Sequence, residues 1–218
     1  MRLRIMPNIL CIETSIGKCS VALQHNGIED YIETKQSFMQ SELLFVLIQE
    51  LLKKNSLEYK DFDIFACTLG PGSFTGIRIG IAAVRGIKKI LPDIQLLGVS
   101  TLEVMASDLQ FPVVEEKILA VLNASGGDLY AQEFSSNGFP FGKIYSLQKK
   151  KLENKRKGSL LVVEQSSFYY EQGLTVNLTA RSLLRKALKI ISERKQEVYR
   201  NIQPIYVKDP NITTKILA

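Results

Sequence analysis

A glycine-rich segment, Thr68 to Ile87, holds the residues whose types and spacing come nearest to a known binding motif. An apolar run at 62–67 precedes it and predicts a strand, and the segment then opens a helix. The glycines and proline at 70–72 impose a tight turn, and Ser73 or Thr75 can cap the helix that follows. Backbone N–H groups in such a turn point at whatever lies above it, often an anion.

The established phosphate-binding fingerprints do not fit this segment. A P-loop has glycines five residues apart followed by Lys, whereas Gly70 and Gly76 are six apart and Ile77 comes next. The dinucleotide pattern fails too, because Thr75 stands where its third glycine belongs. The segment therefore predicts a turn and a helix start without identifying a phosphate ligand.

Gly76, Gly80 and Ala83 share one face of the predicted helix, since they are spaced four and three residues apart. Each interior glycine costs roughly 1 kcal/mol relative to alanine, and a face without side chains lets another backbone come close. Two occupants of this face remain open at this stage: the sheet of the chain itself, or a helix of a partner protein.

A second helix is predicted from a capping box at Ser37 and Gln40 to about Lys54. It carries consecutive apolar residues from Leu43 to Ile48, which cover its whole circumference, whereas one docked face needs only a stripe. Part of this helix is therefore expected either to meet a partner or to be buried on two sides.

Composition places the chain among globular proteins of one or two domains. Its 218 residues are 45% hydrophobic and 23% charged, and no window approaches the roughly 18 apolar residues of a membrane span. The first residues are too mixed for a signal peptide. Cys11, Cys19 and Cys67 lie in apolar runs and predict buried thiols in a reducing compartment. The expected location is the cytoplasm, without membrane contact.

The formal net charge of +6 is concentrated in one stretch. Residues 149–157 hold six lysines and arginines against one glutamate, a net +5, so the rest of the chain is nearly neutral. A solvated loop is the expectation for such a run. A nucleic-acid backbone contact is the alternative, and specific recognition is not expected because no aromatic residue is interleaved.

The order of apolar runs predicts a fold built twice. Three strands, a helix, a strand, a helix, a strand and a helix account for residues up to about 109. The run at 118–125 then repeats the pattern at 9–15, an apolar strand that breaks into a small polar turn. Two βββαβαβα-type halves, 1–102 and 103–218, predict a duplicated α/β fold whose second half is reduced, with the C-terminal tail packing back on the first.

Four motifs stand out in this order: I-L-C-I-E-T-S at 9–15, L-G-P-G-S-F-T-G-I-R-I-G at 69–80, G-V-S-T-L-E at 98–103 and P-I-Y-V-K at 204–208. Together they resemble the TsaB (YeaZ) family over nearly the full chain. The resemblance implies the duplicated ASKHA (actin-like ATPase, ribonuclease H-like) fold. It also implies a non-catalytic partner of TsaD, which attaches threonylcarbamoyl to N6 of adenosine 37 in tRNAs that read ANN codons.

The same resemblance implies partners and an interface. Helices of the first half would pack against those of a TsaD-like subunit, a TsaE-like ATPase would join, and the chain alone would form a homodimer. The expected interface residues are Leu43, Leu47, Gly76, Arg78, Gly80 and Ala83. No cofactor of its own is expected, tRNA would be met indirectly, and ATP or ADP would sit at the interface between subunits.

Catalytic groups are scarce. His25 is the one histidine in the sequence, so the two-histidine metal motif of TsaD-like enzymes cannot be built, and no metal is expected. An ASKHA kinase or ATPase, the alternative function, needs acidic groups at two phosphate-facing turns. Glu13 could serve at one turn, but neutral Asn123 stands at the other, and Ser125 replaces the arginine that the family usually has. A weak nucleotide site would use Glu13, Thr14, Ser15 and Ser73, for which turn and cap chemistry is the alternative.

Overall fold

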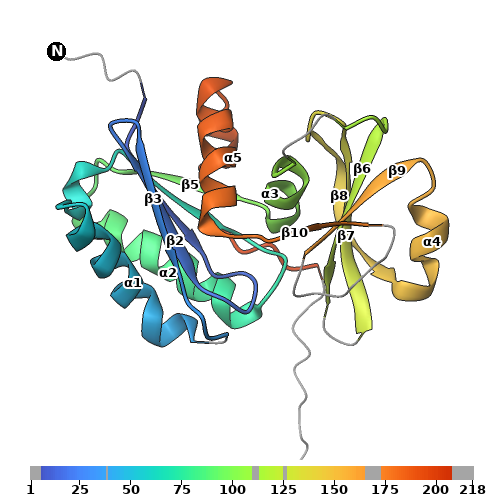
Figure 1. The fold of residues 1–218 in the computed structure, drawn as a ribbon, viewed down its shortest axis with the longest axis horizontal. Coiled ribbons are helices and arrows are strands. Elements are labelled where there is room, and N and C mark those ends of the chain that lie inside the picture. Colours follow the sequence, from blue (N-terminus) through green and yellow to red (C-terminus); the bar gives the residue numbers. More distant parts are fainter. Residues whose placement is uncertain (1–5, 38, 110–112, 125–126, 165–172, 208–218) are drawn as a thin grey trace, which may run out of the picture.

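The protein is described by a computed structural model over residues 6–37, 39–109, 113–124, 127–164 and 173–207. Its described residues form two five-stranded mixed sheets, with helices between the sheets and on their outer faces (Figure 1). Ser125, which stands where the family usually has arginine, lies outside the described residues, as does Lys208 of the last motif.

The first sheet has the order β3-β2-β1-β4-β5. Its strands are β1 (Ile9–Glu13), β2 (Ser20–His25), β3 (Ile28–Glu33), β4 (Ile64–Thr68) and β5 (Gln95–Val99). β1, β4 and β5 run parallel, while β2 and β3 are antiparallel to their neighbours. Parallel strands of this kind are buried on both faces, which explains why β1 and β4 are apolar almost throughout.

The second sheet repeats that plan, in the order β10-β9-β6-β7-β8. Its strands are β6 (Lys117–Asn123), β7 (Asp128–Ser135), β8 (Pro140–Gln148), β9 (Ser159–Glu164) and β10 (Leu174–Val176). β6 is central as β1 is, and it pairs antiparallel with β7 and parallel with β9. The same order and directions in both sheets confirm the predicted duplication.

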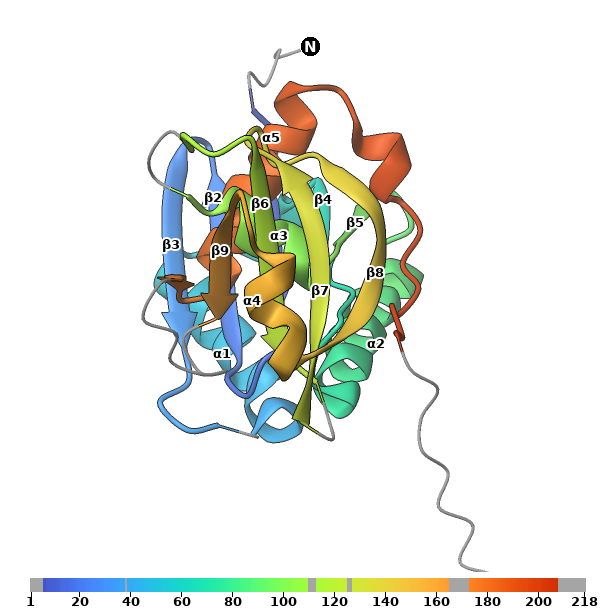
Figure 2. The same ribbon diagram turned by 90° about the vertical axis from the view of Figure 1, so that its right-hand side faces the viewer.

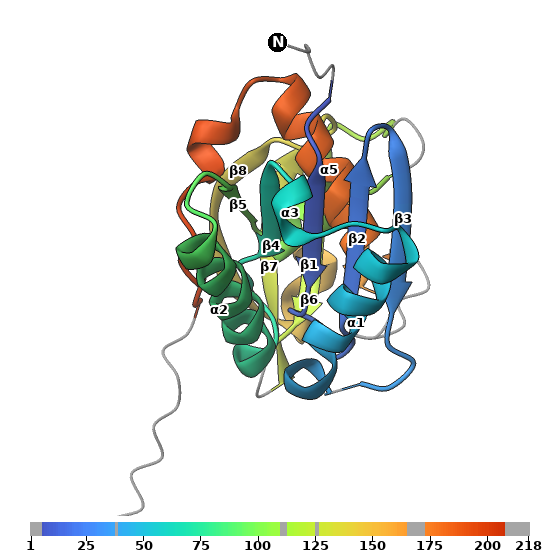
Figure 3. The same ribbon diagram turned by 90° about the vertical axis from the view of Figure 1, so that its left-hand side faces the viewer.

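Two long helices cover the outer face of the first sheet, α1 (Gln40–Lys54) and α2 (Phe74–Ile90), as Figure 3 shows. A one-turn helix, η1 (Tyr59–Asp61), follows α1. The predicted capping box is wrong: α1 begins after Met39 without a side-chain cap. Gln40 is instead buried, and its Nε2 donates to the carbonyl of Gly17 at 2.9 Å, so its amide makes a tertiary contact and does not cap the helix.

Helices α3 (Thr101–Ser107) and α5 (Ala180–Ser192) lie between the two sheets. α5 comes from the end of the chain but packs on β1, β2 and β4, while α3 follows the first sheet but packs on β6, β7 and β9. The predicted boundary at 102/103 falls inside α3. One apolar core therefore joins residues of both sheets around these helices.

The second half carries less helix on its outer face. Residues Lys149–Lys151 form the one-turn helix η3 and Leu152–Lys155 form the short helix α4, which lies over the outer face of the second sheet (Figure 2). The basic stretch is therefore helical rather than a plain loop. After α5, a short helix η4 (Gln196–Tyr199) leads to a segment at 202–206 that returns to the first half. There the Ile205 N–H donates to the Leu69 carbonyl at 2.8 Å.

Candidate functional site

The glycine-rich turn and the start of α2 lie directly on the turn that follows β1. The Ser73 N–H donates to the Ser15 carbonyl at 2.7 Å, and Thr14 Oγ1 donates to the Gly76 carbonyl at 2.8 Å. A β-carbon on Gly72 or Gly76 would fall well inside 3.0 Å of a backbone carbonyl oxygen in that turn. The small residues are therefore required because two stretches of backbone touch here.

The predicted nucleotide-site residues come together in this turn, where they bond to one another. Glu13 Oε1 accepts from both the Ser15 N–H and Ser15 Oγ at 2.6 Å. Thr101 Oγ1 donates to Ser15 Oγ at 3.1 Å, and Ser73 Oγ accepts from the Gly76 N–H at 3.2 Å as an N-cap. Glu13, Thr14 and Ser15 are all at most 1% exposed. Turn and cap hydrogen bonds therefore engage Thr14, Ser15, Ser73 and one oxygen of Glu13.

Glu13 lies at the carboxyl end of β1, where burial raises its pKa above 4.5 although hydrogen bonds from Ser15 act in the opposite direction. Its second oxygen, Oε2, is buried without a hydrogen-bond partner among the described residues. The folded state therefore binds this proton more tightly than the unfolded chain does.

A pH dependence follows from the Glu13 carboxyl. The free energy of unfolding should fall as pH rises from about 4.5 through the higher folded pKa, because the ionised form is the one that burial disfavours. Glu13→Gln cannot ionise, so its stability relative to the natural protein should improve between about pH 5 and pH 8. Urea unfolding of both proteins across this range measures the difference. Parallel pH profiles would contradict the assignment.

The thiols lie in the same part of the core. Cys11, Cys19 and Cys67 are free and buried, as predicted. Burial raises the pKa of Cys19 and of Cys67 to about 12, and that of Cys11 well above its ordinary 9.0. A thiol nucleophile needs the thiolate form, so these residues are packing side chains. Within the described residues, no group of three or more His, Cys, Asp or Glu side chains could hold a metal ion.

Four of the six predicted interface residues are buried within the chain, and the interface itself stays a prediction. A β-carbon on Gly80 would lie 2.6 Å from Thr14 Oγ1, and Gly76 touches the same turn, so the chain itself occupies the glycine face of α2. Leu47 and Ala83 are also buried, in the core between the first sheet and its outer helices. A partner helix could not reach Gly76 or Gly80 without displacing the turn after β1 that covers them.

Leu43 and Arg78 do reach the surface. Leu43 is half-buried on α1. Arg78 is exposed on α2, where its guanidinium carbon stands 3.7 Å from the Phe74 ring centroid and its Nε donates to Tyr206 Oη at 2.9 Å. These contacts fasten the returning segment at 202–206 to the first turn of α2.

The exposed apolar surface of the first half lies elsewhere on the two outer helices. Phe45 and Val46 on α1 are 48% and 53% exposed, and Ile90 at the end of α2 is 79% exposed. A groove of about 640 Å³ runs between the helices. It is lined by Phe45, Gln49, Leu52, Lys53, Leu57, Glu58, Tyr59, Lys60, Ile87, Ile90 and Leu91. The apolar run at 43–48 was the signal for Phe45 and Val46, since it exceeded one buried stripe.

Comparison with known sequences and structures gives consistent matches. The family model for TsaD, tRNA N6-adenosine threonylcarbamoyltransferase, matches residues 37–138. The TsaB protein of Escherichia coli strain K12, named a tRNA threonylcarbamoyladenosine biosynthesis protein, is 26% identical over 96% of this chain and 97% of its own length. A TsaB of Buchnera aphidicola (subsp. Baizongia pistaciae) is 30% identical to this chain. The aligned part covers 61% of this chain and 60% of the relative.

Two solved structures from Pseudomonas aeruginosa share the fold. One is described as an uncharacterized protein with similarity to peptidase YeaZ, with a TM-score of 0.75 and 22% identity over 93% of this chain and 100% of that one. The other is YeaZ, with a TM-score of 0.73 and 22% identity over 92% and 100% of the respective chains.

The repeated strand order, the shared core and these structures define a duplicated α/β protein of the actin-like (ASKHA) class. The sequence relatives identify a narrower group of proteins than the fold does. The chain is similar in sequence to TsaB proteins, over nearly its whole length in the Escherichia coli case, and it shares the YeaZ fold. Among the described residues, no helix is long and apolar enough to cross a membrane.

Proposed function

We propose that this chain is a non-catalytic subunit that binds a TsaD-like transferase and supports threonylcarbamoyl transfer to N6 of adenosine 37 in tRNAs reading ANN codons. The observation that carries this proposal is the exposed apolar surface of α1 and α2, formed by Phe45, Val46, Ile90 and the groove between the helices. Apolar patches of this kind mark protein–protein contacts more often than bare solvent faces.

The sequence relatives support a TsaD-like partner. A protein named tRNA N6-adenosine threonylcarbamoyltransferase, from Bacillus thuringiensis strain Al Hakam, is 28% identical over 59% of this chain and 43% of its own length. In a two-fold dimer, the same surface of each subunit forms the contact. Two related proteins with similar first halves could pack their corresponding helices together in the same way. The same helices would hold the homodimer when the chain is alone.

Catalysis is assigned to the partner for reasons of chemistry. Glu13, Thr14 and Ser15 are buried in a self-bonded turn, and the second half has Asn123 where a carboxylate would be needed. The complex would also include a TsaE-like ATPase, with ATP or ADP held between subunits and no cofactor in this chain. It would act in the cytoplasm, where tRNA is modified.

Phe45→Glu should weaken the complex with the TsaD-like subunit at least about 100-fold, because the charge would be buried in an apolar contact. The matched control is Val198→Glu, since Val198 is 78% exposed on η4 outside the groove. Sedimentation velocity of each variant with the TsaD-like subunit gives the affinities.

Equal binding by both variants would overturn the helical interface. ATP turnover by the chain alone that is lost on Glu13→Ala would contradict the non-catalytic assignment, and would favour the ASKHA ATPase or kinase alternative instead.

A further inference from the structure

The basic segment formed by residues 149–157 is a second surface that the proposed subunit contact does not use. It carries a net +5 of the chain's +6. Figure 1 places α4, which follows η3 within it, at the end of the long axis opposite α1. A partner on the outer helices of the first half would therefore leave the basic segment exposed.

The segment is fixed in place by its one apolar residue. Leu152 is 2% exposed and packs in a core with Leu119, Leu147 and Leu161 of the second sheet. The Arg156 N–H donates to the Leu152 carbonyl at 2.9 Å, which closes the turn of α4. The lysines on either side of Leu152 are thus presented by ordered backbone.

Part of this charge is neutralised within the chain. Lys155 Nζ lies 2.5 Å from Glu133 Oε1, and Arg156 Nε lies 2.8 Å from Glu153 Oε2. Lys150, Lys151 and Lys157 are exposed and have no ion-pair partner among the described residues. These three cations give the segment its unbalanced positive field.

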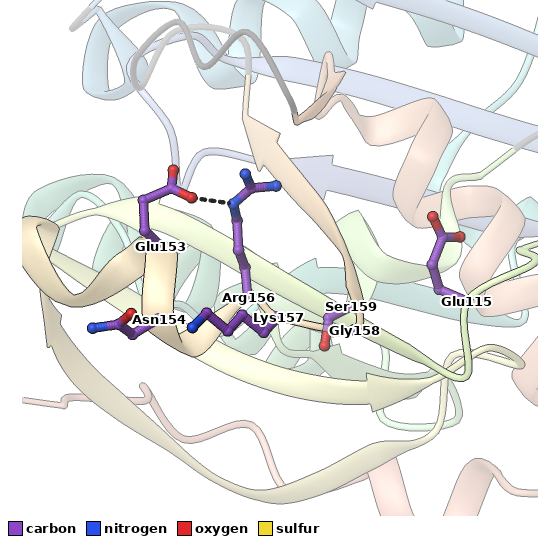
Figure 4. Close-up of a pocket in the computed structure, with 7 residues that line it drawn as sticks. All are labelled: Glu115, Glu153, Asn154, Arg156, Lys157, Gly158 and Ser159. Carbon is purple, nitrogen blue, oxygen red and sulfur yellow. Dashed lines mark hydrogen bonds and ion pairs between the residues drawn. The ribbon is translucent and has the colours of Figure 1, made fainter.

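The geometry of the lysines favours an extended polyanion over a compact anion. η3 has about three residues per turn, so the side chains of Lys149–Lys151 spread around its axis instead of converging. The adjacent hollow, of about 490 Å³, is lined by Glu115 and Glu153 as well as Arg156 and Lys157. Figure 4 shows Glu153 joined to Arg156 beside it. Carboxylates on the lining oppose a small phosphate there.

We propose that the segment at 149–157 contacts the phosphate backbone of tRNA directly, without reading its sequence. The inference rests on the proposed function, which brings tRNA to the complex. Lysines contribute to such contacts as point charges that release counterions from the backbone, so the interaction adds affinity and salt dependence but no base specificity.

The test compares Lys150→Gln/Lys151→Gln/Lys157→Gln with a control that removes the same charge elsewhere, Lys18→Gln/Lys35→Gln/Arg194→Gln. The control residues are also exposed and without an ion-pair partner in the described part of the chain. Fluorescence anisotropy with an unmodified tRNA transcript gives the affinity of the complex, and of this chain alone, at several salt concentrations. Co-purification first checks that each variant still binds the TsaD-like subunit.

The segment variant should lose roughly 10-fold in tRNA affinity at low salt, and its salt slope should flatten by about 2, whereas the control should change less than about 2-fold. Equal losses in both variants, or none in either, would overturn the inference while leaving the subunit contact intact. Failure to co-purify would count against the proposed function, and the titration of the chain alone would still test the segment. Binding of each protein to phosphatidylglycerol vesicles is measured as well. If the segment variant lost vesicle binding but kept its tRNA affinity, the tRNA contact would be overturned in favour of a membrane surface.

Discussion

Replacing Gly76 by alanine is expected to lower the free energy of unfolding by about 3 kcal/mol or more. The new β-carbon would lie far inside 3.0 Å of the Thr14 carbonyl oxygen, which belongs to backbone at the end of β1. A flexible side chain could move aside, but this carbonyl can move only with its strand. The Thr14 hydroxyl also donates to the Gly76 carbonyl, so any shift costs that bond too.

Gly86→Ala is the matched control, because it places the same methyl group in the same helix. A β-carbon on Gly86 meets no atom within 4 Å in the described part of the chain. Alanine at this site should stabilise the protein by up to about 1 kcal/mol through helix propensity. Urea unfolding of both variants measures the contrast. Similar effects at Gly76 and Gly86 would show that the glycine face of α2 is not packed as described.

Lys186→Met is the second variant with a large expected effect, a loss of about 3–5 kcal/mol in unfolding free energy. Lys186 Nζ lies 2.9 Å from Glu103 Oε1 between α5 and α3, and both side chains are less than a tenth exposed. Tyr199 Oη donates to the same carboxylate oxygen at 2.5 Å. Removing the ammonium leaves a buried carboxylate with the phenol as its remaining partner.

Two controls separate this effect from general loss of charge. Lys60→Met removes the cation of a solvent-exposed pair with Glu58 and should leave the unfolding midpoint nearly unchanged. The double variant Glu103→Leu/Lys186→Met removes both buried charges and should recover much of the lost stability. A double variant as unstable as Lys186→Met would mean that the loss comes from packing.

Local patterns were sufficient to predict most elements. The apolar strand predicted at the start of 9–15 became β1, Ile9–Glu13, and the helix predicted to about Lys54 became α1, Gln40–Lys54. Both signals come from the period with which side chains meet a core. The duplication was visible for the same reason, since a repeated fold needs a repeated apolar order.

Local patterns could not predict which segment of the chain packs against each face of a helix. Spacing placed Gly76 and Gly80 on one side of α2, but no local rule says that Thr14, more than sixty residues earlier in the chain, fills that side. The partner interface was therefore assigned to glycines that the chain itself covers. Phe45 and Val46 were within the apolar run that indicated an interface. Which residues of that run face outward depends on how α1 is rotated against the sheet, and this became clear only in the structure.

The two inner helices have been exchanged between the halves: α3 covers the inner face of the second sheet, and α5 covers that of the first. Separating the two sheets would expose the apolar side chains that they share in one core around these helices. A hinge motion of the kind that closes a cleft around a ligand is therefore costly in this molecule. The exchanged helices and the core around them therefore join the two halves into one packed unit.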